Sequence, residues 1–550
     1  MRPADTSDLW WRTAVIYCLD IETFQDSDGD GVGDIEGLCD RIDYLSELGV
    51  TCLWLMPFQP TRDLDDGYDI TDFTAVDPRL GDLGGFVELL RIAHDRGIRV
   101  IMDLVVNHTS DRHPWFRSAR RSRTSKHRDY YVWRDRPPRT SQKTVFPGEE
   151  DSVWEHDERT DQYYLHSFYR HQPDLNLAEP AVRAEIARVV GFWTQLGVDG
   201  FRLDAVPFLI STPGAADETD PHEFLRELHR FVGRRRGGAV LLGEVGLPHA
   251  DQLAYFGSCG TELELQFDFE TMQAVFLSAV RHEAGPLADV LGNRPAVDRR
   301  LGWSTFLRNH DELTLEQLDE QGRQEVFDAL APDERQRVYG RGIVRRLAPM
   351  MGGDPRRIRQ AYSLLFSLPG APMLLYGEEI GMGELLTMPD RAAIRTPMQW
   401  DAGPSGGFST ARPSRVPAIP TGGYAPEHVN VHDQLRDPDS LLSFVRLLIA
   451  RYRSAPEIAW GDLSIVDTGD PAVLAHACRA DGVVFVAAHN FAADARRVEI
   501  EIPDADDDTS SVTDLLSNAP VDPADGRLVL DLEGYGFRWL RRVSSGARRS

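Results

Sequence analysis

Short apolar runs alternate with longer amphipathic segments over the first two-thirds of the chain. Such runs are typical of buried parallel strands, and the segments between them have the spacing of helices that cover a sheet. The runs predict eight strands, at residues 14–21, 51–55, 99–104, 200–203, 240–242, 263–267, 304–307 and 372–376. The pattern therefore predicts the α/β fold class and a (β/α)8 TIM barrel.

Two long stretches interrupt this pattern. Residues 107–171 follow the third predicted strand and are rich in Arg, Asp, Trp and Tyr, and the stretch is too long for a simple βα loop. We expect it to form an inserted subdomain over the strand ends. Residues 314–353 follow the seventh predicted strand, and here we expect a helical insertion with a helix over 333–347. Both insertions would cover the mouth of the barrel.

The pattern changes again near the end of the chain. Residues 403–423 are dense in Gly, Pro, Ser and Thr and predict a loop, and residues 440–453 have the apolar spacing of a last barrel helix. From 456 to 543 the chain has short alternating runs such as VVFVAAHNF and RRVEIEI, which predict a C-terminal antiparallel β-sandwich domain. The catalytic barrel would then consist of residues 1–106 and 172–455.

Composition narrows the range of functions. The 550 residues include 42% hydrophobic residues, enough for a large core, and the net charge of −27 opposes binding to nucleic acid or to anionic lipid. No run of eighteen apolar residues occurs and the first residues do not resemble a secretion signal, so we expect no membrane partner and a cytoplasmic location. The five cysteines are widely spaced and predict buried free thiols: Cys18, Cys39, Cys52, Cys259 and Cys478.

Three acidic residues stand at the ends of separate predicted strands: Asp204 in GFRLDAV, Glu244 in VLLGEV and Asp311 in FLRNHDE. The carboxyl ends of barrel strands meet at one mouth, and cleavage of a glycosidic bond requires two facing carboxyl groups. Arg202 alternates with Asp204 along an extended run, so it can hold that carboxylate ionised as a nucleophile. Glu244 closes an apolar strand, where burial would raise its pKa and make it a proton donor.

Other polar residues occupy equivalent positions. The third strand ends in DLVVNH, which places Asp103, Asn107 and His108 where strand gives way to loop, and His310 beside Asp311 could hold adjacent sugar hydroxyls. Taken alone, a strand-end Asp beside an Arg is more often a structural ion pair than a catalytic group. The occurrence of such motifs in series on strands three, four, five and seven favours an active site.

Four stretches of the chain resemble, in order, the four signature regions of the α-amylase family of glycoside hydrolases and transglycosylases: DLVVNH, GFRLDAV, LLGEV and FLRNHDE. The resemblance covers nearly the whole chain. It implies that Asp204 is the nucleophile that forms a covalent glucosyl-enzyme, that Glu244 is the general acid and base, and that Asp311 stabilises the distorted sugar. It also implies sugar-binding roles for Asp65, Tyr68, His108, Arg202, His310 and Arg395, the last of these in RTPMQW at the pocket entrance.

Within the family the chain is most similar to the trehalose synthases, through stretches such as HTSDRHPWF, FLRNHDELTLE and SLPGAPMLLYGEEIGMG. This similarity implies retaining α-glucosyl transfer on a disaccharide, maltose, which is interconverted with trehalose without an organic cofactor. The similarity also implies that the protein forms a homo-oligomer and acts together with a maltokinase. No residue pattern in the chain indicates either association.

Two departures from that branch leave alternatives open. GEVGLPHADQ follows the acid where trehalose synthases have an Asn/Trp-containing stretch, and the first strand reads YCLDIETF where they have a Glu directly after the Tyr and an Arg-Ser before the Phe. An α-glucosidase that hydrolyses short α-glucosides with the same residues is therefore one alternative. A non-catalytic sugar-binding barrel is another, although such relatives lose one or more carboxylates and all three are present here.

An acidic loop, DSDGDGVGD, follows the first strand and predicts a structural calcium ion. Its spacing imitates a calcium loop with five expected ligands: Asp26, Asp28, Asp30, the carbonyl of Val32, and Asp34. Gly37 stands where an EF-hand requires Glu, so the loop is not an EF-hand and instead resembles the calcium loop of glucosidase-like family members. The resemblance also implies a second calcium ion at Asn107 and Asp174, a site weakened by Ser211, where relatives have a further carboxylate.

Overall fold

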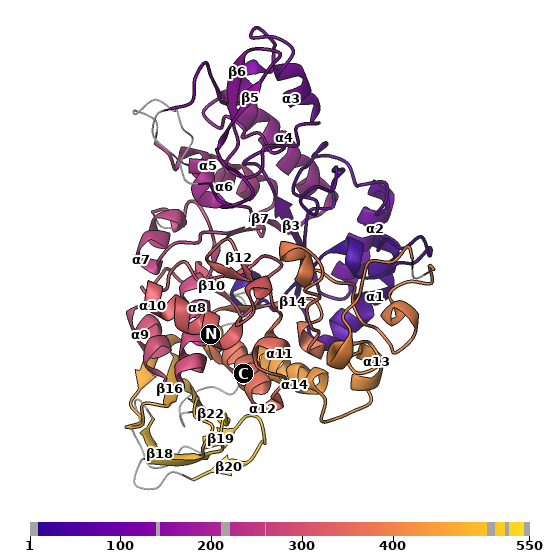
Figure 1. Ribbon diagram of the computed structural model, residues 1–550. Coiled ribbons are helices and arrows are strands. Elements are labelled where there is room, and N and C mark those ends of the chain that lie inside the picture. Colours follow the sequence, from indigo (N-terminus) through magenta and orange to yellow (C-terminus); the bar gives the residue numbers. More distant parts are fainter. Residues whose placement is uncertain are drawn as a thin grey trace.

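Eight parallel strands close into a barrel in the order in which they occur in the chain (Figure 1). The computed structural model describes residues 9–138, 144–210, 220–258, 260–412, 414–502, 512–522 and 527–543. The barrel strands are β1 (Ile16–Leu19), β2 (Cys52–Leu55), β3 (Arg99–Leu104), β7 (Gly200–Leu203), β8 (Val240–Gly243), β9 (Leu265–Phe267), β10 (Gly302–Phe306) and β14 (Ala371–Leu375). All eight predicted strands are confirmed, and almost every residue in them is buried because helices cover the outside of the barrel.

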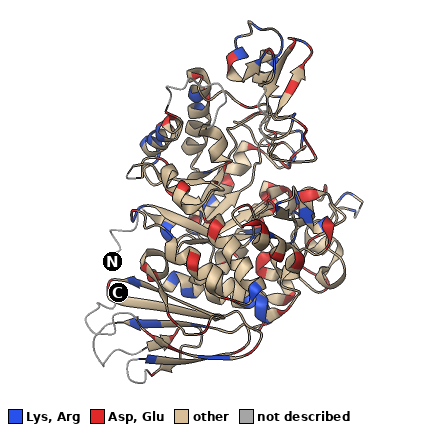
Figure 2. Ribbon diagram, turned by 60° about the vertical axis from the view of Figure 1, so that its left-hand side comes forward, with Lys and Arg blue, Asp and Glu red and all other residues tan. Residues whose placement is uncertain are grey.

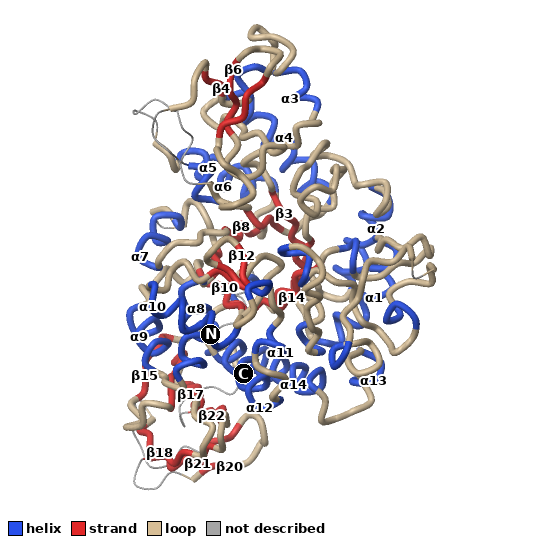
Figure 3. The backbone as a smooth tube through the Cα atoms, in the orientation of Figure 1, coloured by secondary structure: helices blue, strands red, loops and turns tan. Residues whose placement is uncertain are grey.

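Helices surround the barrel, as the tube view shows (Figure 3). The longer ones are α1 (Ile35–Leu48), α2 (Leu83–Asp95), α4 (Pro180–Leu196), α6 (Glu223–Arg235), α8 (Phe269–Arg281), α9 (Gly285–Asn293), α12 (Pro355–Ser367) and α14 (Leu441–Ser454). The predicted last barrel helix is confirmed as α14, which begins where the Ser440 side chain accepts a hydrogen bond from the Ser443 N–H. Helix α1 ends at Gly49, whose φ of 98° is left-handed and favours glycine.

A glycine at the start of β7 allows the strand that carries Arg202 to lie close to its neighbour. A Cβ atom on Gly200 would lie 2.3 Å from the carbonyl oxygen of Val240, which is shorter than any tolerated contact. Gly200 pairs with Val240 and Arg202 pairs with Leu242 in the parallel ladder. Only glycine at position 200 therefore permits this register, which sets the height of Arg202 in the barrel.

The first insertion projects from the barrel at the top of Figure 1. It contains α3 (Pro114–Ala119) and an antiparallel sheet in the order β4-β6-β5, with β4 (Trp133–Arg134), β5 (Trp154–Asp157) and β6 (Gln162–Leu165). Val132, Val153, Trp154 and Leu165 form a small apolar core of its own. This stretch is therefore a folded unit rather than an extended loop.

The second insertion is part helix and part sheet. It contains β11 (Leu313–Thr314), α10 (Glu320–Leu330), β12 (Arg337–Val338), β13 (Gly342–Ile343) and α11 (Leu347–Met350). The prediction of a helix over 333–347 is wrong, because that stretch forms a hairpin in the sheet β11-β13-β12. The turn of this hairpin requires left-handed backbone at Tyr339 (φ 54°) and Gly340 (φ 68°), which an α-helix cannot accommodate.

The C-terminal domain lies at the opposite end of the molecule from the first insertion (Figure 1). It is antiparallel as predicted, with a six-stranded sheet in the order β15-β16-β17-β22-β19-β20 and a two-stranded sheet β18-β21. Its strands are β15 (Asp462–Val466), β16 (Val473–Ala480), β17 (Val483–Asn490), β18 (Arg496–Glu501), β19 (Val512–Asp514), β20 (Pro520–Val521), β21 (Arg527–Leu532) and β22 (Phe537–Val543). Apolar residues from both sheets share one core.

Two buried histidines attach this domain to the barrel. Nε2 of His476 is 2.9 Å from the carbonyl oxygen of Ser367, and Nε2 of His489 is 2.9 Å from Oγ of Ser363, both on α12. Burial lowers the pKa of His476 to about 4, so the imidazole is uncharged at neutral pH and pairs with α12 without an ionic partner.

Charged residues are spread over the molecule (Figure 2), and the described cysteines are free thiols. Figure 2 shows acidic and basic residues interspersed over the barrel and both outer domains. Within the described ranges, no helix combines the length and apolar composition needed to cross a membrane. Cys18, Cys52 and Cys478 are buried free thiols and Cys39 is partly buried, whereas Cys259 lies outside the described residues.

Candidate active site

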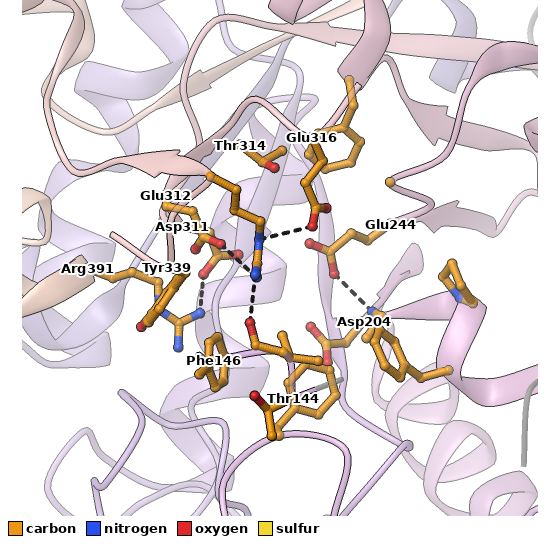
Figure 4. Close-up of a pocket in the computed structure, with 18 of the residues that line it drawn as sticks. Thr144, Phe146, Asp204, Glu244, Asp311, Glu312, Thr314, Glu316, Tyr339 and Arg391 are labelled. Carbon is orange, nitrogen blue, oxygen red and sulfur yellow. Dashed lines mark hydrogen bonds and ion pairs between the residues drawn. The ribbon is translucent and has the colours of Figure 1, made fainter. Parts of the chain in front are cut away.

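A cavity of about 1010 Å³ opens at the carboxyl ends of the barrel strands (Figure 4). Asp204, Glu244 and Asp311 all line it, although Asp204 and Asp311 are more than a hundred residues apart in the chain. Asp65, Tyr68 and His108, which the sequence analysis placed in the sugar-binding set, line the same cavity. The barrel thus brings the predicted catalytic carboxylates to one mouth.

Arg202 joins the two carboxyl groups that the chemistry requires. Its Nη1 donates to Oδ1 of Asp204 at 2.6 Å, and its Nη2 lies 2.8 Å from Oε2 of Glu244. Nη1 also donates to Oδ1 of Asp103 at 2.6 Å, and Arg202 is only 1% exposed. One buried guanidinium therefore faces three carboxyl groups and holds Asp204 and Glu244 in a common orientation.

Burial in this pocket raises the pKa of Glu244 to about 7, with repulsion from Asp204 and Asp311 adding to the effect and Arg202 opposing it. Burial likewise raises the pKa of Asp204 to about 7 against the pull of Arg202. Because the two groups face the same guanidinium, they titrate as a pair, and near neutral pH the pair retains one proton. A carboxylate nucleophile beside a protonated acid is the state that retaining glycoside chemistry requires.

Asp311 is held in the opposite charge state. Oδ1 of Asp311 accepts from Nη1 of Arg391 at 2.7 Å and from Nη2 of Arg395 at 3.0 Å. Burial acts to raise the pKa of Asp311, but attraction to His310 and to these two arginines keeps it well below its usual range. Since burial also lowers the pKa of His310 well below its ordinary value, the arginines carry this effect at neutral pH, and Asp311 stays ionised.

Tyr68 and His108 line the pocket, and His310 is fully buried behind Tyr68. The Tyr68 hydroxyl is 2.6 Å from Nε2 of His310 and donates to Oδ2 of Asp103 at 3.2 Å. Nε2 of His108 lies 3.0 Å from the Tyr68 carbonyl oxygen. Within the described part of the chain, Nδ1 of His108 and Nδ1 of His310 are buried without a hydrogen-bond partner. Such groups are expected to bind a ligand hydroxyl or water.

Arg395 lies behind Asp311 rather than at the pocket entrance. It is 8% exposed, it donates through Nε to the carbonyl oxygen of His310 at 2.7 Å, and it does not line the cavity. Arg391, four residues earlier, lines the cavity and bridges Asp311 to Asp65, whose Oδ1 accepts from Nη2 at 2.6 Å. Arg391 was not among the site residues predicted from the sequence, because nothing in RAAIRTP shows that its side chain reaches Asp65 and Asp311.

Both insertions contribute walls to the cavity, as predicted in outline. The first supplies Thr144, Val145, Phe146, Pro147 and Phe168, and the second supplies Thr314, Glu316, Gln317, Arg323, Tyr339, Gly340 and Arg341. None of these residues was identified individually from the sequence, because no local motif marks a side chain that points across a gap. Their contacts with each other are described below.

The stretch that departs from the trehalose synthase pattern also lies in the wall. Gly246 and Leu247 line the cavity beside Glu244, and the Gly246 carbonyl accepts from Nε2 of Gln317 at 2.8 Å. A Cβ atom on Gly246 would meet no other atom within 4 Å. The pocket therefore has free space next to the acid, where a larger side chain would fit.

The acidic loop after β1 brings three of its predicted ligands together. Carboxylate oxygens of Asp26, Asp28 and Asp34 lie within 4.8 Å of one another. Asp30 is not in this cluster, because its Oδ1 accepts instead from the Val32 N–H at 2.8 Å. Three converging carboxylates are a donor set that suits a hard cation such as calcium.

The two residues expected to hold a second calcium ion, Asn107 and Asp174, are hydrogen-bonded to each other. Nδ2 of Asn107 donates to Oδ1 of Asp174 at 3.2 Å, and the Ser167 N–H donates to the same oxygen at 2.9 Å. Burial raises the pKa of Asp174 to about 7, so it is a weak anionic ligand at neutral pH. Ser211 lies outside the described residues.

Comparison with known proteins decides the family. The model of the α-amylase catalytic domain matches residues 19–329 and 344–461, and that of a sucrose hydrolase-like C-terminal domain matches residues 482–541. The chain belongs to the α-amylase family. The predicted resemblance is therefore confirmed, together with the barrel and the C-terminal β domain that it implied.

Individual relatives cover nearly the whole length of this α-amylase family member. It is 39% identical to the trehalose synthase/amylase TreS of Mycobacterium tuberculosis, over 98% of this chain and 91% of the relative. It is 38% identical to a trehalose synthase of Pimelobacter, over 97% and 96%. Among solved structures, the trehalulose synthase MutB from Pseudomonas mesoacidophila MX-45 superposes with a TM-score of 0.76 at 27% identity, over 97% of this chain and 99% of that chain.

Hydrolases are also among the relatives. An oligo-1,6-glucosidase of Parageobacillus thermoglucosidasius is 32% identical over 84% of this chain and 87% of its own length. Both trehalose synthases and a glucosidase are therefore similar to this chain.

Proposed function

We propose that the protein is a retaining α-glucosyl transferase that interconverts maltose and trehalose. The observation that carries this proposal is the pair Asp204 and Glu244 on one buried guanidinium, at the bottom of a cavity that two insertions cover. The similarity to trehalose synthases over nearly the full chain supports the choice of substrate.

In the first step, the Asp204 carboxylate forms a bond to the anomeric carbon of the non-reducing glucose. The glycosidic C–O bond breaks, its electron pair goes to the leaving oxygen, and Glu244 protonates that oxygen. Glucose is released into the cavity, and its former partner remains bound to Asp204 as a glucosyl ester. Arg202 favours the ionised form of Asp204 before attack, and it also offsets the charge of Asp103, which acts to raise the pKa of Asp204.

The second step reverses the first with a different hydroxyl. The retained glucose turns, Glu244 takes the proton from its anomeric hydroxyl, and that oxygen attacks the anomeric carbon to release Asp204. Ionised Asp311 and the unpartnered ring nitrogens of His108 and His310 would hold the hydroxyls of the distorted sugar through both steps. Water must be kept out, since it competes for the same carbon.

A second candidate function is α-glucosidase activity. The free space at Gly246 next to Glu244 favours it, because this space could admit water to the glucosyl-enzyme. The same residues would then carry out hydrolysis. A non-catalytic sugar-binding barrel is disfavoured by the retention of all three carboxylates in the pocket.

Incubation of the protein with maltose, followed by NMR of the products, separates these functions. We expect trehalose as the main product, with free glucose as a minor one. Glucose alone would support the glucosidase, and unchanged maltose would support the sugar-binding protein. Trehalose as a starting material should yield maltose, because each step is reversible.

We further infer that Asp26, Asp28 and Asp34 bind a structural calcium ion. The ion would stabilise the loop between β1 and α1, whose Asp26 also bonds Ser409 in the distant segment that follows RTPMQW. With free calcium at a hundredfold excess over Kd, binding would stabilise the fold by about 2.7 kcal/mol. We expect calcium to raise the midpoint of thermal unfolding of chelator-treated protein and Asp28→Asn to abolish this increase.

Asp30→Asn is the matched control for this prediction. Asp30 lies two residues from Asp28 in the same loop but outside the cluster, so its variant should keep the calcium-dependent increase. Titration calorimetry with calcium gives a second readout that does not depend on unfolding. Loss of binding in both variants would instead support the five-ligand loop expected from the sequence, and no calcium effect in the parent protein would refute the site.

The cellular setting remains a prediction from the sequence. A cytoplasmic location, a homo-oligomer and association with a maltokinase belong to this proposal only as expectations. Sedimentation of the purified protein, alone and with a maltokinase, would test the last two.

A further inference from the structure

Arg341 lies where the two insertions meet over the pocket. Its Nη1 donates to the carbonyl oxygen of Val145 at 2.7 Å, a contact between residues 196 positions apart. Its Nε is 3.2 Å from Oε1 of Glu316, and its Nη2 donates to Oε1 of Glu312 at 3.3 Å. One guanidinium therefore links the first insertion to Glu312, which directly follows Asp311, and to Glu316, which lies five residues after Asp311.

The backbone of Arg341 is held in place on its own side. The left-handed residues Tyr339 and Gly340 turn the hairpin toward the pocket, and the Leu315 N–H donates to the Arg341 carbonyl at 2.8 Å. The side chain of Arg341 is only 16% exposed. Its position is thus determined by the hairpin and does not depend on a flexible surface contact.

Aromatic rings also pack at the seam, the contact at which the two insertions meet over the pocket. The ring of Phe146 lies 4.8 Å from that of Tyr339 and 4.5 Å from that of Tyr169, and Cζ of Arg391 lies 5.2 Å from the Phe146 centroid. Figure 4 shows Phe146, Tyr339 and Arg391 side by side along one edge of the pocket, with Glu312 and Glu316 further along the wall. The two insertions therefore meet in a packed contact that Arg341 completes.

Two cations, Arg341 and Arg391, face the carboxyl groups at this seam. Glu312 is nearly buried, which raises its pKa against the attraction of both arginines, and Glu316 is half exposed. Without Arg341, Glu316 would lose its ion-pair partner and the Val145 carbonyl would lose its donor. Arg341 also lies within residues 330–343, the internal stretch that the α-amylase model does not match, so this contact is a feature of the chain beyond the common barrel.

We propose that Arg341 is a specificity-determining residue that holds the two insertions together while the glucosyl-enzyme exists, which directs the glucosyl group to glucose rather than to water. This inference rests on the proposed function. Glucose and water compete as acceptors of the glucosyl group. Each forms a bond to the anomeric carbon, releases Asp204 and gives its proton to Glu244. The outcome depends on whether glucose stays in the cavity and water stays out, and an opened seam at Val145 changes both. Arg341 acts through this contact and is a positioning residue.

The test compares initial rates of trehalose and glucose formation from maltose in the parent protein and in Arg341→Ala, Arg341→Lys and Arg337→Ala. We expect Arg341→Ala to raise the ratio of glucose to trehalose by about tenfold, a change in relative barriers of about 1.4 kcal/mol. Arg341→Lys should give an intermediate ratio, because an ammonium keeps the charge but cannot bind three acceptors with a planar fork.

Arg337→Ala is the matched control. Arg337 belongs to the same hairpin, and among the described residues its side chain contacts its own insertion, through the Ala331 carbonyl, Asp328 and the ring of Phe327. Its variant should keep the parent ratio. Should Arg341→Ala fail to fold, Glu316→Gln removes the negative charge of one ion-pair partner of the guanidinium, and it should raise the ratio by a smaller factor.

The possible results are distinct. The role of Arg341 is overturned if folded Arg341→Ala keeps the ratio of glucose to trehalose of the parent protein, even when total turnover falls. It is also overturned if both Arg341→Lys and Glu316→Gln keep that ratio. A parent protein that makes only glucose overturns the proposed function itself, whatever the variants do. A raised ratio in Arg337→Ala equal to that of Arg341→Ala would show that any damage to the hairpin suffices, and it would also overturn the specific role.

Discussion

Replacement of Asp204 by Asn is expected to lower kcat for maltose conversion by about 10⁴-fold or more, because the amide cannot form the glucosyl ester. The fold should persist, since Arg202 keeps its contacts with Asp103 and Glu244, and one of several crowded negative charges is removed. Steady-state rates with maltose, measured by NMR of the products, provide the main readout.

Direct detection of the ester strengthens this test. A 5-fluoro-α-glucosyl fluoride should glycosylate the parent protein with release of fluoride and increase its mass by one fluoroglucosyl group, and it should leave Asp204→Asn unmodified. Peptide mapping should place the group on Asp204. A variant with activity within tenfold of the parent protein, or a label on another residue, would refute the mechanism.

Asp199→Asn is the control for the loss of a buried carboxylate. Asp199 directly precedes β7, at the opposite end of the strand from Asp204, where it accepts from the Val100 N–H at 2.9 Å and from Nη1 of Arg99 at 3.0 Å. Its loss should reduce stability by about 3–5 kcal/mol, because the cations around it lose their partner. Turnover per folded molecule should remain that of the parent protein.

Replacement of Glu244 by Gln is expected to lower kcat for maltose by about 10²–10⁴-fold, the usual contribution of general acid catalysis. The loss should be much smaller for the first step with α-glucosyl fluoride, because fluoride leaves without a proton. Burst kinetics of fluoride release measure this step separately. An equal loss with both substrates would show that Glu244 orients the sugar rather than donating a proton.

The pH profile gives an independent check on the same residue. Burial raises the pKa of Glu244 to about 7, so the acid is protonated below that pH and loses its proton above it. The parent protein should therefore lose kcat/KM for maltose as the pH rises through about 7. Glu244→Gln, assayed with α-glucosyl fluoride, should lack this alkaline decline.

Much of the barrel was predictable because its signals are local. Each buried strand is a short apolar run between turn-forming residues, and all eight runs were visible in the sequence. The helix predicted over 333–347 failed for the converse reason. Its composition suits a helix, but the left-handed turn at Tyr339 and Gly340 and the pairing of β13 with β11 and β12 produce a hairpin.

The candidate site was predictable in its catalytic residues and less so in their surroundings. Asp204, Glu244 and Asp311 were visible because a carboxylate at the end of a buried strand is chemically unusual. Arg391 was not, since a 3-10 turn far along the chain gives no sign that its side chain reaches Asp65 and Asp311. The acidic loop showed the same limit: its spacing suggested Asp30 as a ligand, but the turn directs that carboxylate to the Val32 N–H.

The sequence by itself determined the barrel, the strand-end carboxylates and the α-amylase family, because apolar periodicity and short motifs depend on neighbours in the chain. Only the tertiary structure decided which charges share a partner: Arg202 with Asp103, Asp204 and Glu244, and Arg341 with Val145, Glu312 and Glu316. These contacts arise when the barrel closes and the insertions pack over it, which brings together side chains far apart in the chain. No local sequence pattern shows which of these side chains come into contact, although their contacts govern both the pKa values of the carboxyl groups and the closure of the pocket.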